Sequence, residues 1–144
     1  MEQLELKIFI AMNRALNLIN KANSKVLNKY KLTTPQFAVI EALYHKGELS
    51  VGEVQEKILS TSGTIAVIIK NLEKDNLITR GKDKIDKRKY ILSISEKGQL
   101  LMDKVYPEIE ANINSHISVL DESEQDIFLK YLKKITGYKL WLEK

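Results

Sequence analysis

The strongest chemical signal in this sequence is a cationic segment near its middle, Thr79–Tyr90 (TRGKDKIDKRKY). It contains the basic residues Arg80, Lys82, Lys84, Lys87, Arg88 and Lys89 and the acidic residues Asp83 and Asp86. The excess of four positive charges equals the net charge of +4 of the whole chain, so the remaining sequence is electrically neutral. A concentrated cationic segment is suited to binding a polyanion at one place, which points to nucleic acid.

Short elements around this segment must position it. The β-type runs 77–80 and 90–94 predict a hairpin with the basic residues at its tip. Two short helices are predicted before it, at 51–58 and from the turn 60–64 to about Lys74, the second with its buried side formed by Ile65, Ile68, Ile69 and Leu72. Two helices joined by a tight turn and followed by a basic hairpin predict a winged helix-turn-helix.

The residues that we predict to contact DNA lie on the second helix and on the wing. They are Thr61, Ser62, Gly63, Thr64, Lys70, Arg80, Lys87, Arg88 and Lys89, with Lys57 as a further candidate for a phosphate contact. Small hydrogen-bonding groups at a helix start can meet base edges, and the N–H groups there suit a phosphate. An arginine of the wing can enter the narrow minor groove. Asp86 lies two residues before Arg88, so on an extended hairpin its carboxylate would share a face with the guanidinium and orient it.

Longer amphipathic helices are expected on both sides of this region. Apolar residues at three- and four-residue steps predict helices at 4–29, 35–45, from Ser95, and from Asp121 to Leu142. Capping-box spacing marks three helix starts, Thr33 with Gln36, Ser50 with Glu53 and Asp121 with Glu124. The predicted fold is therefore mainly α with a small β-hairpin wing, in the order α-α-α-α-β-β-α-α. The apolar stripes of the outer helices exceed what one small lobe can bury, which favours a homodimer.

Composition excludes several classes of protein. At 144 residues the chain fits a single domain, and it has no cysteine, hence no disulfide, thiolate metal site or thiol switch. The most apolar N-terminal stretch, 8–19, is too short to cross a bilayer and lacks the features of a signal peptide, so we expect a cytoplasmic protein that does not enter a membrane. Two separated histidines make a metal site unexpected, and no activated nucleophile or phosphate-binding glycine loop is present. We therefore expect no enzyme activity and no cofactor.

Several motifs in order resemble one family of regulators. LITR at 77–80, DKR at 86–88, LSISEKG at 92–98 and LTTPQF at 32–37 are similar to the signature of the multiple-antibiotic-resistance regulator (MarR) family, and the similarity covers nearly the whole chain. The resemblance implies a winged helix-turn-helix at 33–95, dimerisation helices at 1–30 and 96–144, and repression of transcription relieved by a small ligand or an oxidant. By position, Arg88 resembles the family's wing arginine and Asp86 its partner. The lack of cysteine excludes a direct thiol mechanism, and Asn76 stands where the family commonly has glycine.

Two questions stay open at the level of sequence. A small aromatic effector is one possibility, with Phe9, Met12, Phe37 and Tyr44 as wall residues that could equally belong to the core. The alternative function is a winged-helix protein-interaction module without sequence-specific DNA binding. The operator, the regulated genes, the effector and the choice between repression and activation are not encoded in any motif.

Overall fold

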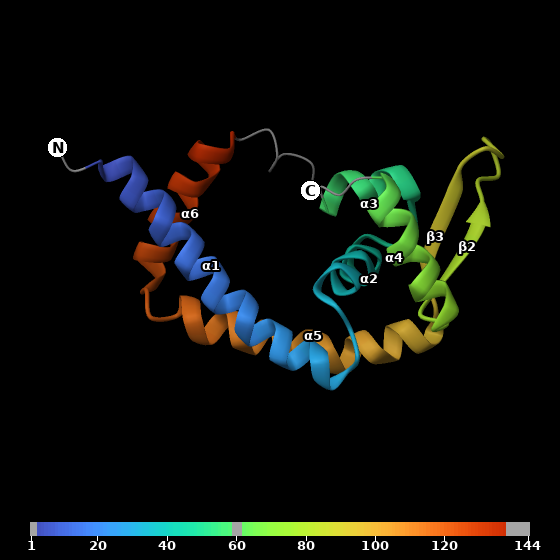
Figure 1. The fold of residues 1–144 in the computed structure, drawn as a ribbon, viewed down its shortest axis with the longest axis horizontal. Helices are drawn as coiled ribbons and strands as arrows, with labels where there is room; N and C mark the ends of the chain where they lie inside the picture. The colour runs from blue at the N-terminus through green and yellow to red at the C-terminus, as the bar shows by residue number, and fades with distance from the viewer. Residues whose placement is uncertain (1–2, 59–61, 138–144) are drawn as a thin grey trace.

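The computed structural model describes residues 3–58 and 62–137 and shows an elongated molecule with a small lobe at one end (Figure 1). The elements in chain order are α1 (Leu4–Lys29), α2 (Thr34–Lys46), β1 (Leu49–Ser50), α3 (Val51–Ile58), α4 (Ser62–Lys74), β2 (Ile78–Lys82), β3 (Tyr90–Ile94), α5 (Glu96–Ile117) and α6 (Glu122–Thr136). The expectation of a mainly α fold with a β-hairpin wing is confirmed. The stretch that was predicted to continue the last helix to Leu142 lies outside the described residues beyond Gly137.

The wing is a three-stranded antiparallel sheet rather than a two-stranded hairpin. Its strand order is β1-β3-β2, with Leu49 opposite Leu92 and Arg80 also opposite Leu92 on the other side. The element order predicted from the sequence, α-α-α-α-β-β-α-α, omitted β1 and was wrong in that respect. Two residues are too few to give a strand pattern, and Ser50 already had a role in the sequence as the cap of α3.

Local capping signals set the helix starts. Thr33 Oγ1 accepts from the backbone N of Gln36 at 3.2 Å, and the Gln36 side chain accepts from the backbone N of Thr33 at 3.0 Å. The same reciprocal pairs join Ser50 with Glu53 and Asp121 with Glu124. All three predicted capping boxes are therefore confirmed.

A residue with a positive φ angle follows two of the lobe's helices. Gly47 after α2 and Asn76 after α4 have φ angles of 80° and 60°. Asn76 thus adopts the geometry for which a glycine is common in the resembled family.

One apolar core joins the lobe to the base of α5. Its buried members come from every element of the lobe and from α1 and α5, and the fully buried ones include Leu27, Ile40, Leu43, Val54, Ile65, Ile69, Leu72, Leu92, Met102 and Val105. The buried side predicted for α4 is confirmed, since Ile65, Ile68, Ile69 and Leu72 all lie in this core. One face of α4 is therefore packed on the core, and the opposite face, which includes Gly63, Val67 and Lys70, is exposed.

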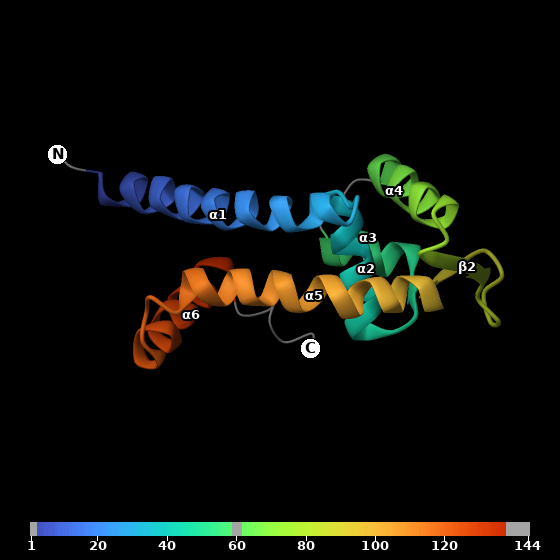
Figure 2. The ribbon, with the colours of Figure 1, turned by 90° about the horizontal axis from the view of Figure 1, so that it is seen from below.

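The long helices α1 and α5 run side by side and carry the lobe at one end (Figure 2). Polar contacts join them: Lys29 Nζ and the Tyr30 hydroxyl both donate to the Glu108 carboxylate, and Asn112 Nδ2 donates to Asn23 Oδ1 at 2.6 Å. Large apolar side chains on α1 and α6 are exposed in the single chain, among them Leu4, Phe9, Leu16, Leu18, Phe128, Tyr131 and Ile135. Within the described residues, no helix is long and apolar enough to cross a membrane.

Candidate nucleic-acid interface

The open face of α4 is the first part of the candidate interface. Gly63, Thr64 and Lys70 are exposed on it, as predicted, and Ser62 begins the helix. Thr61 lies outside the described residues. Sequence reasoning missed Val67, which is 60% exposed on this same face although it is apolar. The signal was available, because Val67 falls outside the three- and four-residue series that Ile65, Ile68, Ile69 and Leu72 form.

The wing tip is the second part, and it is built by aspartates. Asp83 Oδ1 accepts from the backbone N of Ile85 at 3.0 Å, and Asp83 N donates to the carbonyl of Lys89 at 2.9 Å. Lys89 N in turn donates to the carbonyl of Asp86 at 2.9 Å, closing a turn over residues 86–89. Short side-chain acceptors that bond to backbone N–H groups two residues on are a usual way to fix such loops. The tip therefore has a defined shape in spite of its exposure.

Asp86 holds Arg88 by two hydrogen bonds to one oxygen. Asp86 Oδ1 accepts from Arg88 Nε at 3.2 Å and from the Arg88 backbone N at 3.1 Å. The hydrogen bond from the Arg88 side chain, followed by the one from its backbone, lowers the pKa of Asp86 from its ordinary value, so the carboxylate stays ionised. The predicted orienting contact is present, but its basis was wrong. The two residues lie in a turn and not on an extended strand.

Arg80 lies at the base of the wing and is already paired. Its Nη2 atom lies 3.3 Å from Glu73 Oε1 of α4, and its guanidinium stacks 4.8 Å from the centre of the Tyr90 ring. Glu73 Oε1 is buried and, within the described part of the chain, has no hydrogen-bond partner. The ion pair with Arg80 therefore compensates the negative charge of this buried oxygen. Arg80 joins β2 to α4, a structural role beyond the predicted phosphate contact.

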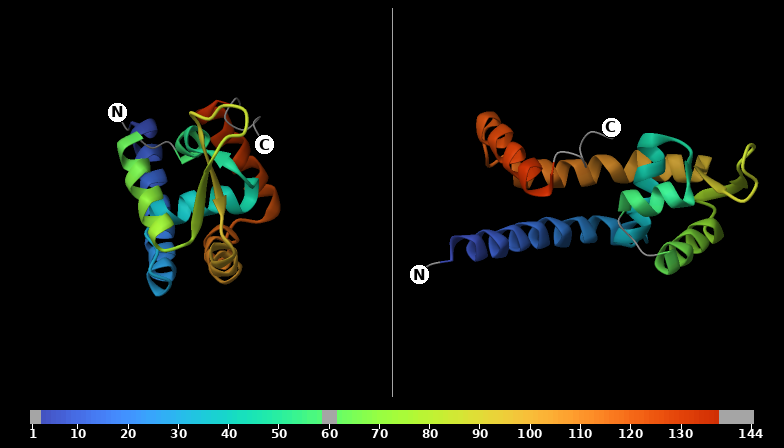
Figure 3. Two further views of the ribbon diagram at one scale, coloured as in Figure 1. Left: turned by 90° about the vertical axis from the view of Figure 1, so that its right-hand side faces the viewer. Right: turned by 90° about the horizontal axis from the view of Figure 1, so that it is seen from above.

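A groove of about 600 Å³ lies between the start of α3, the wing, and Ala66 and Ile69 of α4. It is lined by Ser50, Val51, Gly52, Glu53, Glu56, Ala66, Ile69, Arg80, Arg88, Lys89 and Tyr90. The view along the long axis shows the wing hairpin standing beside α4 (Figure 3). Lys87, Arg88 and Lys89 are all exposed at the tip, whereas Lys57 is exposed on α3. The predicted basic contacts thus belong to two surfaces, the wing with α4 and the outer side of α3.

The four predicted wall residues for an effector are not gathered around one cavity in the single chain. Phe9 and Met12 are exposed on α1, by 62% and 37%. Phe37 and Tyr44 pack against the core, and the Tyr44 hydroxyl donates to Asp103 Oδ1 at 2.8 Å. None of the four lines the groove beside the wing.

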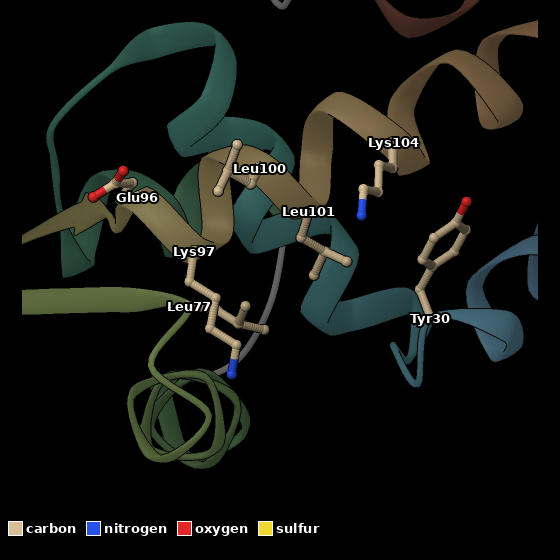
Figure 4. Close-up of a pocket in the computed structure, with 7 residues that line it drawn as sticks. All are labelled: Tyr30, Leu77, Glu96, Lys97, Leu100, Leu101 and Lys104. Carbon is tan, nitrogen blue, oxygen red and sulfur yellow. The ribbon is translucent and has the colours of Figure 1, made fainter.

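A separate cavity of about 530 Å³ lies where α1 ends and α5 and β2 begin. It is lined by Tyr30, Leu77, Glu96, Lys97, Leu100, Leu101 and Lys104. Figure 4 shows Tyr30 and Lys104 on one side and Leu77 and Lys97 on the other, with Leu101 between them. Its lining residues come from distant parts of the sequence and form no motif, so sequence reasoning missed it. Among the residues that the structure describes, no cluster of metal-ligating side chains occurs.

Comparisons with known proteins agree with this geometry. The family described as transcriptional regulator SarA/Rot matches residues 21–105. The HTH-type transcriptional regulator MhqR of Bacillus subtilis is 36% identical over 135 residues, which cover 94% of this chain and 93% of that protein.

Solved structures show the same fold. AbsC, a MarR family transcriptional regulator from Streptomyces coelicolor, superposes with a TM-score of 0.88 at 19% identity, over 96% of this chain and 95% of that one. BpsR of Bordetella bronchiseptica, whose DNA binding is regulated by 6-hydroxynicotinic acid, superposes with a TM-score of 0.80 at 23% identity, over 91% and 99% of the two chains.

Proposed function

This chain belongs to the transcriptional regulator SarA/Rot family and is a DNA-binding transcriptional regulator with the MarR-type winged-helix fold, and we propose that it is a homodimeric repressor that a small aromatic effector releases from a pseudo-palindromic operator. The observation that carries the DNA-binding role is the Arg88 guanidinium, held by Asp86 at the tip of the wing. The wing hairpin itself stands beside α4 (Figure 3). An arginine whose rotamer is fixed before binding loses less side-chain entropy on entering a groove.

The proposed contacts follow from this arrangement. The α4 helices of two protomers enter successive major grooves about 34 Å apart. Ser62, Gly63, Thr64 and Lys70 of α4 contact the base edges and the adjoining phosphates, and Thr61, which lies outside the described residues, remains a predicted contact. Arg88 enters the flanking minor groove, and the phosphate contacts come from Lys57, Arg80, Lys87 and Lys89.

Dimerisation is supported by the apolar surface of the outer helices. The exposed leucine, isoleucine and phenylalanine side chains of α1 and α6 lie far from the wing and are numerous for a monomer. A second copy of the same chain would bury them and set the distance between the two α4 helices. The regulator would act on chromosomal DNA in the cytoplasm.

Selection from a random-sequence duplex pool tests the DNA-binding proposal. Wild-type protein should enrich one inverted repeat with half-sites about one helical turn apart. Affinity for the selected duplex should fall with salt, with a log–log slope of about −0.9 for each phosphate contacted. Failure to enrich any sequence would favour the protein-interaction alternative, which has no support from the family to which the chain belongs.

The effector proposal is supported by the cavity between α1, α5 and β2. Leu77, Leu100 and Leu101 give it an apolar lining, and Lys97 and Lys104 against Glu96 leave one net positive charge that complements a carboxylate. The lining contains Leu77, which leads into β2, so an occupant would contact both a supporting helix and the start of the wing.

Salicylate and 6-hydroxynicotinate, with the uncharged hydroquinone as a comparison, are suitable probes in a competition assay with the selected duplex. The acids should release DNA at lower concentration than hydroquinone, and Lys104→Ala should abolish that preference. Equal release by all three probes in wild type and variant would remove the cavity from the proposal.

A further inference from the structure

Val67 occupies the centre of the open face of α4. The buried residues Ile65, Ile68, Ile69 and Leu72 define the opposite side of this helix, and Val67 is 60% exposed. At 100° per residue, Val67 points almost directly away from that buried side. It therefore lies where a helix inserted into the major groove meets the base pairs.

The surroundings of Val67 leave it accessible. Gly63 lies one turn before it, and a Cβ atom at Gly63 would meet no atom within 4 Å. Lys70 lies one turn after it and is exposed. Val67 is thus an apolar spot between an open glycine surface and a cation that can hold a phosphate.

In the part of the chain that the structure describes, Val67 belongs neither to the apolar core nor to the residues packed against it. A β-branched residue is a weaker helix former than alanine or lysine, because its side chain loses rotamer freedom in a helix. At an exposed position this disadvantage is not offset by burial in the core. A binding partner that covers Val67 would offset the lower helix propensity of valine.

The major groove offers one apolar group that fits this spot, the C5-methyl of thymine, which distinguishes A·T from the other base pairs. We propose that Val67 is a specificity-determining residue that packs against the C5-methyl group of a thymine in each operator half-site. This inference rests on the proposed DNA-binding function and adds to it the base that the centre of α4 reads.

Removal of single methyl groups tests the inference. The duplex that wild-type protein selects from the random pool is remade with deoxyuridine in place of each thymine in turn, which removes only the C5-methyl. One position per half-site should weaken wild-type binding about fourfold, as expected for one buried methyl group, and substitution in both half-sites about fifteenfold.

Val67→Ala should bind the unmodified duplex several-fold more weakly and should no longer respond to deoxyuridine at that position. Such non-additivity identifies a direct contact. Val119→Ala is the matched control, since Val119 is 81% exposed in the turn after α5, and it should respond to deoxyuridine as wild type does.

Three results would overturn the inference while leaving DNA binding intact. They are a selected sequence whose half-sites contain no A·T pair, wild-type affinity that no deoxyuridine substitution changes, and Val67→Ala responding as wild type does. If no sequence is selected at all, the proposed function itself fails. The melting temperature of Val67→Ala, measured alongside, should equal or slightly exceed that of wild type, because the side chain is exposed and alanine is the better helix former.

Discussion

Gly98 of α5 lies directly against the backbone carbonyl of Leu77, and a Cβ atom at Gly98 would be 2.2 Å from that oxygen and 2.9 Å from Cγ1 of Ile94. The carbonyl cannot easily move away, since it also accepts from the backbone N of Ser95 at 3.0 Å. This contact joins the first turn of α5 to the start of the wing. Only glycine permits so close an approach.

Gly98→Ala should therefore destabilise the protein by about 1–3 kcal/mol, the usual cost of overpacking a tight site. Urea unfolding followed by circular dichroism measures it. Gly52→Ala is the matched control, because its new methyl group would meet only Ser50 Oγ at 3.9 Å. That control should be neutral or stabilising by about 0.5 kcal/mol, as is usual for glycine replaced within a helix. Equal unfolding midpoints for Gly98→Ala and wild type would contradict the close contact.

Arg88→Ala should weaken binding to the selected duplex by about tenfold or more, because a charge-assisted contact is lost. The Arg88 side chain is 92% exposed, so the melting temperature should not change. Asp86→Asn should give a smaller loss, since the amide oxygen can still accept while the charge that holds the guanidinium is gone. Lys84→Ala removes the same charge from the same loop and serves as control. If Lys84→Ala weakens binding to the duplex as much as Arg88→Ala does, net charge and not the oriented arginine explains the affinity.

The Glu108 contacts predict a pH-dependent link between α1 and α5. Hydrogen bonds from Lys29 and then from Tyr30 lower the pKa of Glu108 below its ordinary value of 4.5. The carboxylate thus stabilises the fold above that ordinary pKa, and the stabilisation is lost as the pH falls through the lower folded value.

Glu108→Gln should accordingly lower the free energy of unfolding at pH 7, and the difference from wild type should disappear in acid. Denaturant titrations at pH 7, 5 and 3 measure it. Glu56→Gln makes the same charge change at an exposed position of α3 and should show little difference at any of these pH values. If the loss of unfolding free energy in Glu108→Gln stays the same at low pH, the packing of the side chain and not its charge is what stabilises this site.

The proposed dimer interface can be tested at Leu16, which is 57% exposed on α1 in the single chain. Leu16→Asp should change the mass in solution from twice 16.6 kDa towards 16.6 kDa, because a carboxylate cannot be buried cheaply against an apolar partner. Sedimentation equilibrium measures this, and affinity for the inverted repeat should fall with it. Ile85→Asp, at the 95% exposed wing tip, is the mass control and should remain dimeric. An unchanged mass for Leu16→Asp would place the interface elsewhere.

Local signals explain what could be predicted from the sequence. The pairs Thr33–Gln36, Ser50–Glu53 and Asp121–Glu124 act within one helical turn, so their spacing alone identified three helix starts. The series Ile65, Ile68, Ile69 and Leu72 likewise fixed the buried face of α4. The cationic wing needed only the count of charges between two β-type runs.

Contacts between distant residues explain what could not be predicted. Leu49 pairs with Leu92, far along the chain, and β1 exists only through that pairing. The Arg80–Glu73 pair depends on the angle between β2 and α4, which spacing does not reveal. The Asp86–Arg88 contact was expected from spacing, yet its turn geometry arises from the hydrogen bonds of Asp83 and Lys89.

The two-residue strand β1 has a mechanical consequence. Ser50 ends this strand and also caps α3, so the wing sheet and α3 share a continuous piece of backbone. A force that bound DNA exerts on the wing is therefore transmitted through this backbone to α3, and through the core to α4. When α1 and α5 tilt, the lobe of α2, α3, α4 and the wing must rotate as one body. A small rotation near Gly98 then produces a larger displacement at the tip of the wing.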